Sequence, residues 1–113
     1  MAHLDGYSFG RISVDGFEQT DDLIVLPDRV VGNWWRRGGH SLALEDLEEV
    51  LDELPERLIV GAGAYGRLRP DPAVIAELER RGVSLECLPT GAAVHRYSEL
   101  DERSAAAALH LTC

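Results

Sequence analysis

The chain has 113 residues and a formal net charge of −9, with 20 acidic residues against 11 arginines and no lysine. This length predicts a single domain over residues 1–113, and the acidity disfavours binding to nucleic acid or to a membrane surface, because phosphates and anionic lipids would be repelled. No apolar run could span a bilayer, no signal-peptide pattern begins the chain and only two cysteines occur, so we expect a cytoplasmic protein with reduced thiols.

The first part of the chain predicts paired β-strands. Apolar and polar residues alternate over 7–14 and are interrupted at Gly10, which suits a bulge. The pair Asp15-Gly16 predicts a tight type I′ turn, because both central residues of that turn need a positive φ. The apolar run within 22–27 predicts a strand that is buried on both faces.

An irregular stretch over 28–43 precedes a predicted helix over 44–54. The helix is predicted from one apolar stripe at helical spacing, and acidic residues in its first turns suit the positive end of the helix dipole. Pro55 ends the pattern. The stripe consists of Leu44, Leu47, Val50, Leu51 and Leu54.

A strand-helix-strand pattern comes next. Short apolar strands are predicted over 57–61 and 83–88, with a helix over 71–81 between them. The pair Asp71-Pro72 is a favourable helix start, because a carboxylate can cap the helix and proline suits its first position. We expect the two strands to be parallel neighbours joined by a right-handed crossover.

The last part of the chain predicts one more helix and leaves the tail open. The helix is expected over 91–100, with Thr90 as its N-cap. In the tail, 103–113, four alanines favour a helix by propensity. Alternating residues of the same tail, such as Leu109 and Leu111, share one face at a period of two, which is typical of a terminal strand.

Three glycines between the predicted strand and the next helix form a G-x-G-x-x-G motif, Gly61, Gly63 and Gly66. A dinucleotide site needs such glycines to lead directly into a helix whose amides meet the pyrophosphate. Residues 67–70 intervene here and end in a proline, which disfavours that site. Glu86 keeps the dinucleotide alternative open, because it stands about where a ribose-binding acid would be.

A small anion suits this loop better than a dinucleotide. Gly61, Gly63 and Gly66 let the backbone approach a ligand closely, and Thr90 and Gly91 begin a helix whose first amides lack intrahelical partners. Both segments follow predicted strands at the edge where open α/β sheets bind ligands. These five residues are our candidates for ligand binding, and the alternative is that the glycines only turn the chain and Thr90 only caps its helix.

The sequence Trp34-Trp35-Arg36-Arg37 is a basic and aromatic cluster in an acidic chain. Such residues can anchor a protein interface. Alternatively, one tryptophan completes the core while the arginines pair with acids of the same chain. Because neighbouring residues of an extended segment point to opposite faces, we expect one ring buried and the other exposed beside an arginine.

The histidines and cysteines do not predict a metal site. His110 and Cys113 would face opposite sides of a terminal strand, and zinc needs several ligands at close range. Cys87 lies in an apolar strand and fits a small core residue. Neither His40 nor His95 has a spacing that indicates nucleophilic catalysis with a cysteine. The sequence therefore predicts no cofactor and indicates no catalytic residue.

An ordered set of short motifs over nearly the whole chain resembles a widespread family of small domains of unknown function. That family includes the adipogenesis-associated domain protein and a mitochondrial complex I assembly factor. The motifs are Trp34-Trp35 before Gly39-His40, Glu45-Asp46-Leu47, Ile59 to Gly63, Leu88-Pro89-Thr90 with Ala93-Val94, Tyr97, and Leu109 to Cys113.

The resemblance implies a three-layer β+β/α fold, with a mixed central sheet, helices on one side and a small antiparallel β element on the other. It also favours a strand for the tail. It implies no catalytic residues, and the eukaryotic relatives act through other proteins. We therefore expect a non-enzymatic interaction or assembly module. The alternative is a protein that binds a small anion or metabolite between the glycine loop and the helix at Thr90.

Overall fold

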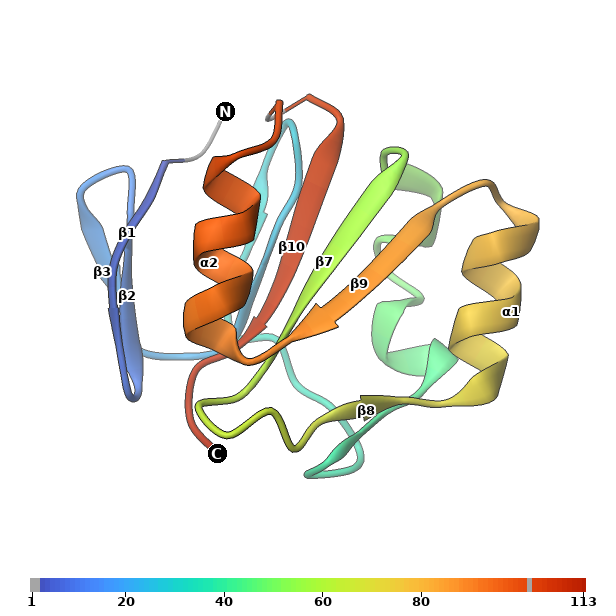
Figure 1. Ribbon diagram of the computed structural model, residues 1–113, viewed down its shortest axis with the longest axis horizontal. Coiled ribbons are helices and arrows are strands. Elements are labelled where there is room, and N and C mark those ends of the chain that lie inside the picture. The colour runs from blue at the N-terminus through green and yellow to red at the C-terminus, as the bar shows by residue number, and fades with distance from the viewer. Residues whose placement is uncertain (1–2, 102) are drawn as a thin grey trace.

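A computed structural model describes residues 3–101 and 103–113 of the chain. The N-terminal part forms a small antiparallel sheet (Figure 1). Its strands are β1 (Leu4–Ser8), β2 (Arg11–Val14) and β3 (Phe17–Gln19), with β2 in the middle. Short strands and tight turns follow from the alternating pattern of this segment.

One of the two turns in the small sheet is the turn that the sequence predicts, whereas the other replaces a predicted bulge. Asp15 and Gly16 join β2 to β3 with φ of 53° and 86°, which confirms the predicted tight turn. Gly10 is not a bulge but part of the turn between β1 and β2, where its φ of 83° favours glycine. The irregular register falls earlier, between Asp5 and Ser8.

Five further strands form the central sheet: β4 (Leu23–Val25), β5 (Val30–Val31), β7 (Arg57–Ala62), β9 (Ser84–Leu88) and β10 (Ala105–His110). Their order across the sheet is β5-β4-β10-β7-β9. The pairs β10–β7 and β7–β9 are parallel, whereas β4 is antiparallel to both β10 and β5. The sheet is therefore mixed, as predicted.

The C-terminal tail forms the central strand β10. Its six residues are buried, and four of them are alanines, Ala105 to Ala108. Small side chains in the middle of the sheet let the layers on both faces approach closely, so packing overrides the helix propensity of alanine. The helix α1 (Pro72–Arg80) starts after Asp71 and joins the parallel neighbours β7 and β9, as predicted. The Asp71 carboxylate, however, makes no capping hydrogen bond.

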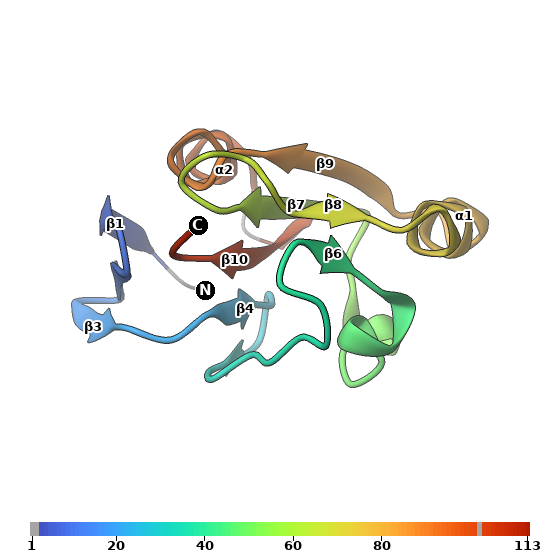
Figure 2. The same ribbon diagram turned by 90° about the horizontal axis from the view of Figure 1, so that it is seen from below.

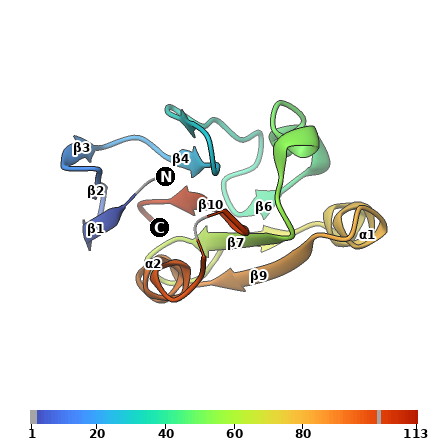
Figure 3. The same cartoon turned by 90° about the horizontal axis from the view of Figure 1, so that it is seen from above.

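The predicted three-layer α/β fold is confirmed, but its two helices lie on opposite faces of the sheet. The side chains of α2 (Thr90–Ser98) pack with Ile59 and with the small sheet, whereas those of α1 pack with Leu58 and Val60. Figures 2 and 3 show the two helices on opposite sides of the central sheet. The chain moves outward from β7 to β9 and then returns past β7 to β10. Because crossovers between parallel strands are right-handed, two crossovers that run in opposite directions place their helices on opposite faces.

The segment 44–54 is not the continuous helix that its stripe predicts. It forms two 3₁₀ helices, η1 (Leu44–Leu47) and η2 (Leu51–Glu53), although the stripe does face the core. The indole Nε1 of Trp34 donates to the Asp46 carbonyl at 2.9 Å. That carbonyl would accept the Val50 amide in an α-helix, and the amide instead donates to Leu47 at 2.9 Å.

Two short strands complete the fold, β6 (Ser41–Leu42) and β8 (Arg69–Pro70). They pair in parallel and bring the stretch after the tryptophans next to the segment that follows the glycine loop. In the described ranges 3–101 and 103–113, no helix is both long and apolar enough to cross a membrane.

Candidate functional site

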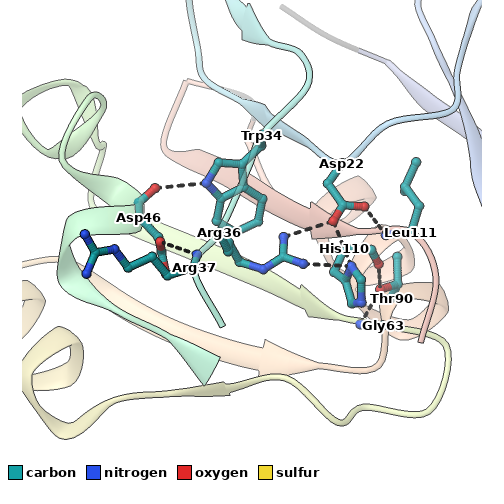
Figure 4. Close-up of polar contacts among 9 residues, drawn as sticks. All are labelled: Asp22, Trp34, Arg36, Arg37, Asp46, Gly63, Thr90, His110 and Leu111. Carbon is teal, nitrogen blue, oxygen red and sulfur yellow. Dashed lines mark hydrogen bonds and ion pairs between the residues drawn. The ribbon is translucent and has the colours of Figure 1, made fainter. Parts of the chain in front are cut away.

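Thr90 is a joint between three elements rather than the cap of its own helix. Pro89 occupies the N-cap position, and Thr90 is the first residue of α2 and fully buried. Its hydroxyl donates to the His110 carbonyl at 2.5 Å and accepts the Gly63 amide at 2.9 Å (Figure 4). The side chain is thus used across the fold, and a hydroxyl so placed cannot also reach back to cap α2.

The first two glycines of the motif pack against this joint. A Cβ on Gly61 would lie 2.9 Å from Leu109 Cδ2 and 3.1 Å from Thr90 Oγ1. Gly63 has a φ of 90°, and a Cβ there would lie 2.9 Å from the Thr112 carbonyl. Both residues are buried, and the Gly63 amide is already hydrogen-bonded, so this part of the loop is a close backbone contact.

Only part of the predicted ligand-binding set borders a pocket. Gly66 lines a pocket of about 490 Å³ at the carboxyl ends of β7 and β9, beside Pro89. Gly91 is exposed, and a Cβ there would lie 3.9 Å from the Tyr7 ring. The structure therefore separates Gly66, which lines this pocket, from Gly61, Gly63 and Thr90, which do not. Anion binding by this set stays a prediction.

The chain path does not favour the dinucleotide alternative. After the glycines the backbone continues into β8, so no helix N-terminus receives the loop directly. Glu86 lies within hydrogen-bond distance of Arg96, at 3.0 Å, and of Arg57, at 3.2 Å. The hydrogen bond from Arg96 is the main reason why the pKa of Glu86 lies below its ordinary value. This acid is engaged in ion pairs on the sheet.

A buried polar network that the sequence did not indicate surrounds Asp22 (Figure 4). Asp22 Oδ2 lies 2.8 Å from His110 Nδ1 and 2.9 Å from Arg36 Nη1, and Asp22 Oδ1 accepts the Leu111 amide at 2.8 Å. Burial alone would raise the pKa of Asp22. The hydrogen bonds that Asp22 makes with His110, Leu111 and Arg36 together outweigh burial, so the pKa lies below its ordinary value.

The four residues of the basic and aromatic cluster divide into a buried pair and an exposed pair. Trp34 is 7% exposed and Trp35 is 75% exposed, which confirms the predicted split. The Arg36 side chain is only 6% exposed, and its guanidinium lies 4.7 Å from the centroid of the Trp34 ring. Arg37 is exposed and forms an ion pair with Glu45 at 3.4 Å. Trp34 and Arg36 therefore support the fold from inside.

The exposed pair borders a second pocket, of about 400 Å³. We call it the Trp35 pocket. Its aromatic and apolar lining includes Trp34, Trp35 and Val31, and its charged lining is Arg37, Glu45, Asp46, Glu48 and Glu49. Four acids against one arginine make this pocket negative.

Both cysteines are free thiols, Cys87 half-buried and Cys113 exposed. Burial raises the pKa of Cys87, and the positive charge of Arg69 opposes that rise only in part. In the part of the chain that the structure describes, no group of three His, Cys, Asp or Glu side chains is arranged to hold a metal ion.

Over residues 4–110 the chain matches the family described as a protein of unknown function (DUF498/DUF598), and it belongs to that family. The membership agrees with the family of unknown function that the sequence motifs resemble. The closer kinship with the adipogenesis-associated protein and the complex I assembly factor stays a prediction.

Solved structures of similar proteins share the fold. The conserved hypothetical protein PH1505 from Pyrococcus horikoshii OT3 is 30% identical, with a TM-score of 0.80 over 97% of this chain and 98% of that one. The protein MT938 is 31% identical, with a TM-score of 0.75 over the full length of both chains. A Bartonella henselae protein described as an outer membrane protein is 27% identical, with a TM-score of 0.84 over 99% of this chain and 96% of that one.

Proposed function

We propose that this protein is a non-enzymatic interaction module of the cytoplasm that binds a basic segment of another protein in the Trp35 pocket. The observation that supports this function most is an indole ring that is 75% exposed beside a pocket lined by four acids. Large aromatic rings at the surface are enriched among the residues that dominate protein interfaces.

The charges of the pocket favour an arginine or lysine of the partner. The ion pairs at its rim, Arg37 with Glu45 at 3.4 Å and Arg29 with Glu49 at 3.7 Å, are solvent-exposed and therefore weak. Glu48 forms no ion pair with any described residue and is exposed. A cation from the partner can pair with these carboxylates at little cost, and its approach is steered by the net negative field.

The rings supply the apolar part of the same surface. The exposed face of Trp35 suits a guanidinium or an aliphatic stem, because a cation over an indole is attracted by the ring electrons. Trp34, which also lines the pocket, is held by its hydrogen bond to the Asp46 carbonyl and by the stacked Arg36. A rigid base of this kind lowers the entropy that binding must overcome.

A binding experiment with a matched aromatic control tests this function. The probe is the peptide Arg-Arg-Leu-Arg-Arg, with Glu-Glu-Leu-Glu-Glu as its charge-reversed counterpart, titrated against the protein by amide NMR. We expect the basic peptide to shift residues of the Trp35 pocket, and Trp35→Ala to weaken binding about tenfold. Glu48→Gln should weaken it less, because one of four acids is removed.

Tyr65→Ala is the control, because Tyr65 is also an exposed ring, at 69%, and does not line the Trp35 pocket. Equal binding of both peptides contradicts the proposed function. So does an equal loss of affinity for the basic peptide in Trp35→Ala and Tyr65→Ala. Recovery of the protein in a membrane fraction of its own cells contradicts the cytoplasmic location.

A further inference from the structure

The pocket that Gly66 lines lies at the carboxyl ends of β7 and β9. Figure 1 shows β8 passing this edge of the central sheet. We call this pocket the Tyr65 pocket, after the exposed ring on its rim. Its volume is about 490 Å³, and it is lined by Tyr65, Gly66, Arg69, Pro70, Cys87 and Pro89, with Ala62 and Leu88 at the strand ends. We propose that the Tyr65 pocket binds a small organic anion, with its carboxylate or phosphate on Arg69 and its flat body against Tyr65.

The positive charge of Arg69 is not neutralised by a carboxylate of the described residues. Most arginines of this acidic chain pair with carboxylates, as Arg29 does with Glu53 and Arg81 does with Glu77. Arg69, by contrast, forms no ion pair with a carboxylate of the described residues. Its Nη1 donates to the carbonyls of Gly66 and Leu68, which directs the guanidinium along the wall of the pocket.

The remaining donors of Arg69 are therefore available to an anion. No described residue accepts a hydrogen bond from its Nε or Nη2, and a guanidinium offers two parallel donors that match a carboxylate or a phosphate. Arg69 and Cys87 both line the pocket, and the positive charge of Arg69 opposes the rise in the pKa of the Cys87 thiol. An anion bound there would meet a positive potential in a chain that is otherwise negative.

The walls of the pocket are rigid and suit the apolar body of a ligand. Pro70 and Pro89 stand on its rim with fixed φ and without amide hydrogens. Gly66 has a φ of 66°, and a Cβ there would lie 3.2 Å from Pro89 Cγ, so a glycine lets the loop close against the proline. The pocket also falls at the carboxyl ends of parallel strands, where open α/β sheets bind ligands.

The aromatic rim supplies a stacking surface. Tyr65 is 69% exposed, and the guanidinium of Arg67 lies 5.6 Å from the centroid of its ring. Arg67 likewise forms no ion pair with a carboxylate of the described residues. An aromatic anion would therefore meet one cation in the pocket, the Tyr65 ring as a stacking surface, and a second cation beside that ring.

The test compares anions that carry a ring with a neutral molecule of the same shape. The probes are phenyl phosphate and benzoate, with benzamide as the neutral counterpart and NAD as the dinucleotide, each titrated by amide NMR. We expect the two anions to shift the amides of Gly66 and Cys87 and to slow alkylation of Cys87 by iodoacetamide. Benzamide should do neither, because it lacks the charge that Arg69 would hold.

Two variants that each remove one arginine charge test whether anion binding depends on Arg69. Arg69→Gln should weaken binding of phenyl phosphate about tenfold, because a charge-assisted pair is lost. Arg11→Gln, which removes an exposed arginine of the small sheet, should leave it unchanged. The amide spectrum of each free variant checks that it is folded. No shift at Gly66 or Cys87, equal binding of benzamide, an unchanged affinity in Arg69→Gln, or saturation by NAD alone would each overturn the proposal.

Discussion

Replacing Asp22 with asparagine keeps the shape of this side chain but removes the charge that faces Arg36 and His110. At 2.9 Å and an effective dielectric constant of about 20, the attraction between Asp22 and Arg36 is about 6 kcal/mol before desolvation is subtracted. Removal of one partner of a buried pair leaves the other charge uncompensated, at about 3 to 5 kcal/mol. The Asp22 side chain is 18% exposed, so we expect a loss of about 3 kcal/mol in unfolding free energy.

The loss in unfolding free energy caused by Asp22→Asn should become smaller as the pH falls. The pKa of Asp22 is lower in the folded protein than its ordinary value of about 4. A carboxylate of this kind stabilises the fold above its unfolded pKa, and the contribution disappears as the pH falls through the folded pKa. The difference between wild type and Asp22→Asn should therefore be full at neutral pH and shrink as the pH falls below about 4.

Urea unfolding followed by tryptophan fluorescence measures this difference. Asp52→Asn is the matched control, because Asp52 also pairs with an arginine, Arg81 at 2.8 Å, but its side chain is 94% exposed. That variant should lose less than about 1 kcal/mol. A loss for Asp22→Asn that is as small as that of the control, or that is the same at about pH 3 as at neutral pH, would refute the reasoning.

Three further predictions concern the joint at Thr90, the glycine loop and the thiols. Thr90→Val should cost about 3 kcal/mol in unfolding free energy, because two buried hydrogen bonds lose their partner, and Thr90→Ser should recover most of it. Gly63→Ala should cost more than about 2 kcal/mol, and Gly6→Ala, which has a positive φ but open space, only about 1 kcal/mol. Iodoacetamide should modify Cys113 before Cys87 in the folded protein, and equal rates would contradict this order.

The sequence by itself determined the elements whose start or end depends on a few neighbouring residues. Asp15-Gly16 turns the chain because their backbones accept positive φ, and Asp71-Pro72 begins α1 because proline suits the first helical turn. The strands β7 and β9 follow from apolar runs of strand length, and their parallel pairing follows from the helix between them. The opposite orientation of Trp34 and Trp35 was predictable from the alternation of an extended segment.

The tertiary structure decided the features that depend on residues distant in the sequence. The stripe over 44–54 forms two 3₁₀ helices, and the Asp46 carbonyl that an α-helix would offer to Val50 accepts the indole of Trp34. Asp22 and His110 lie 88 positions apart and meet only because β4 and β10 pair in the sheet. Thr90, predicted as a cap, instead joins the glycine loop after β7 to β10, since its hydroxyl accepts from Gly63 and donates to His110.

In the candidate site, too, some features were predictable from the sequence and others depend on the tertiary structure. The glycine motif and its place after a strand were visible in the sequence, because glycine, strand and turn patterns are local. The separation of Gly66 from Gly61 and Gly63 was not visible in the sequence, because it depends on packing against Pro89, Leu109 and Thr112. An arginine without a carboxylate partner, such as Arg69, can be recognised only when every acid has a position in space, because spacing along the chain does not determine which charges meet.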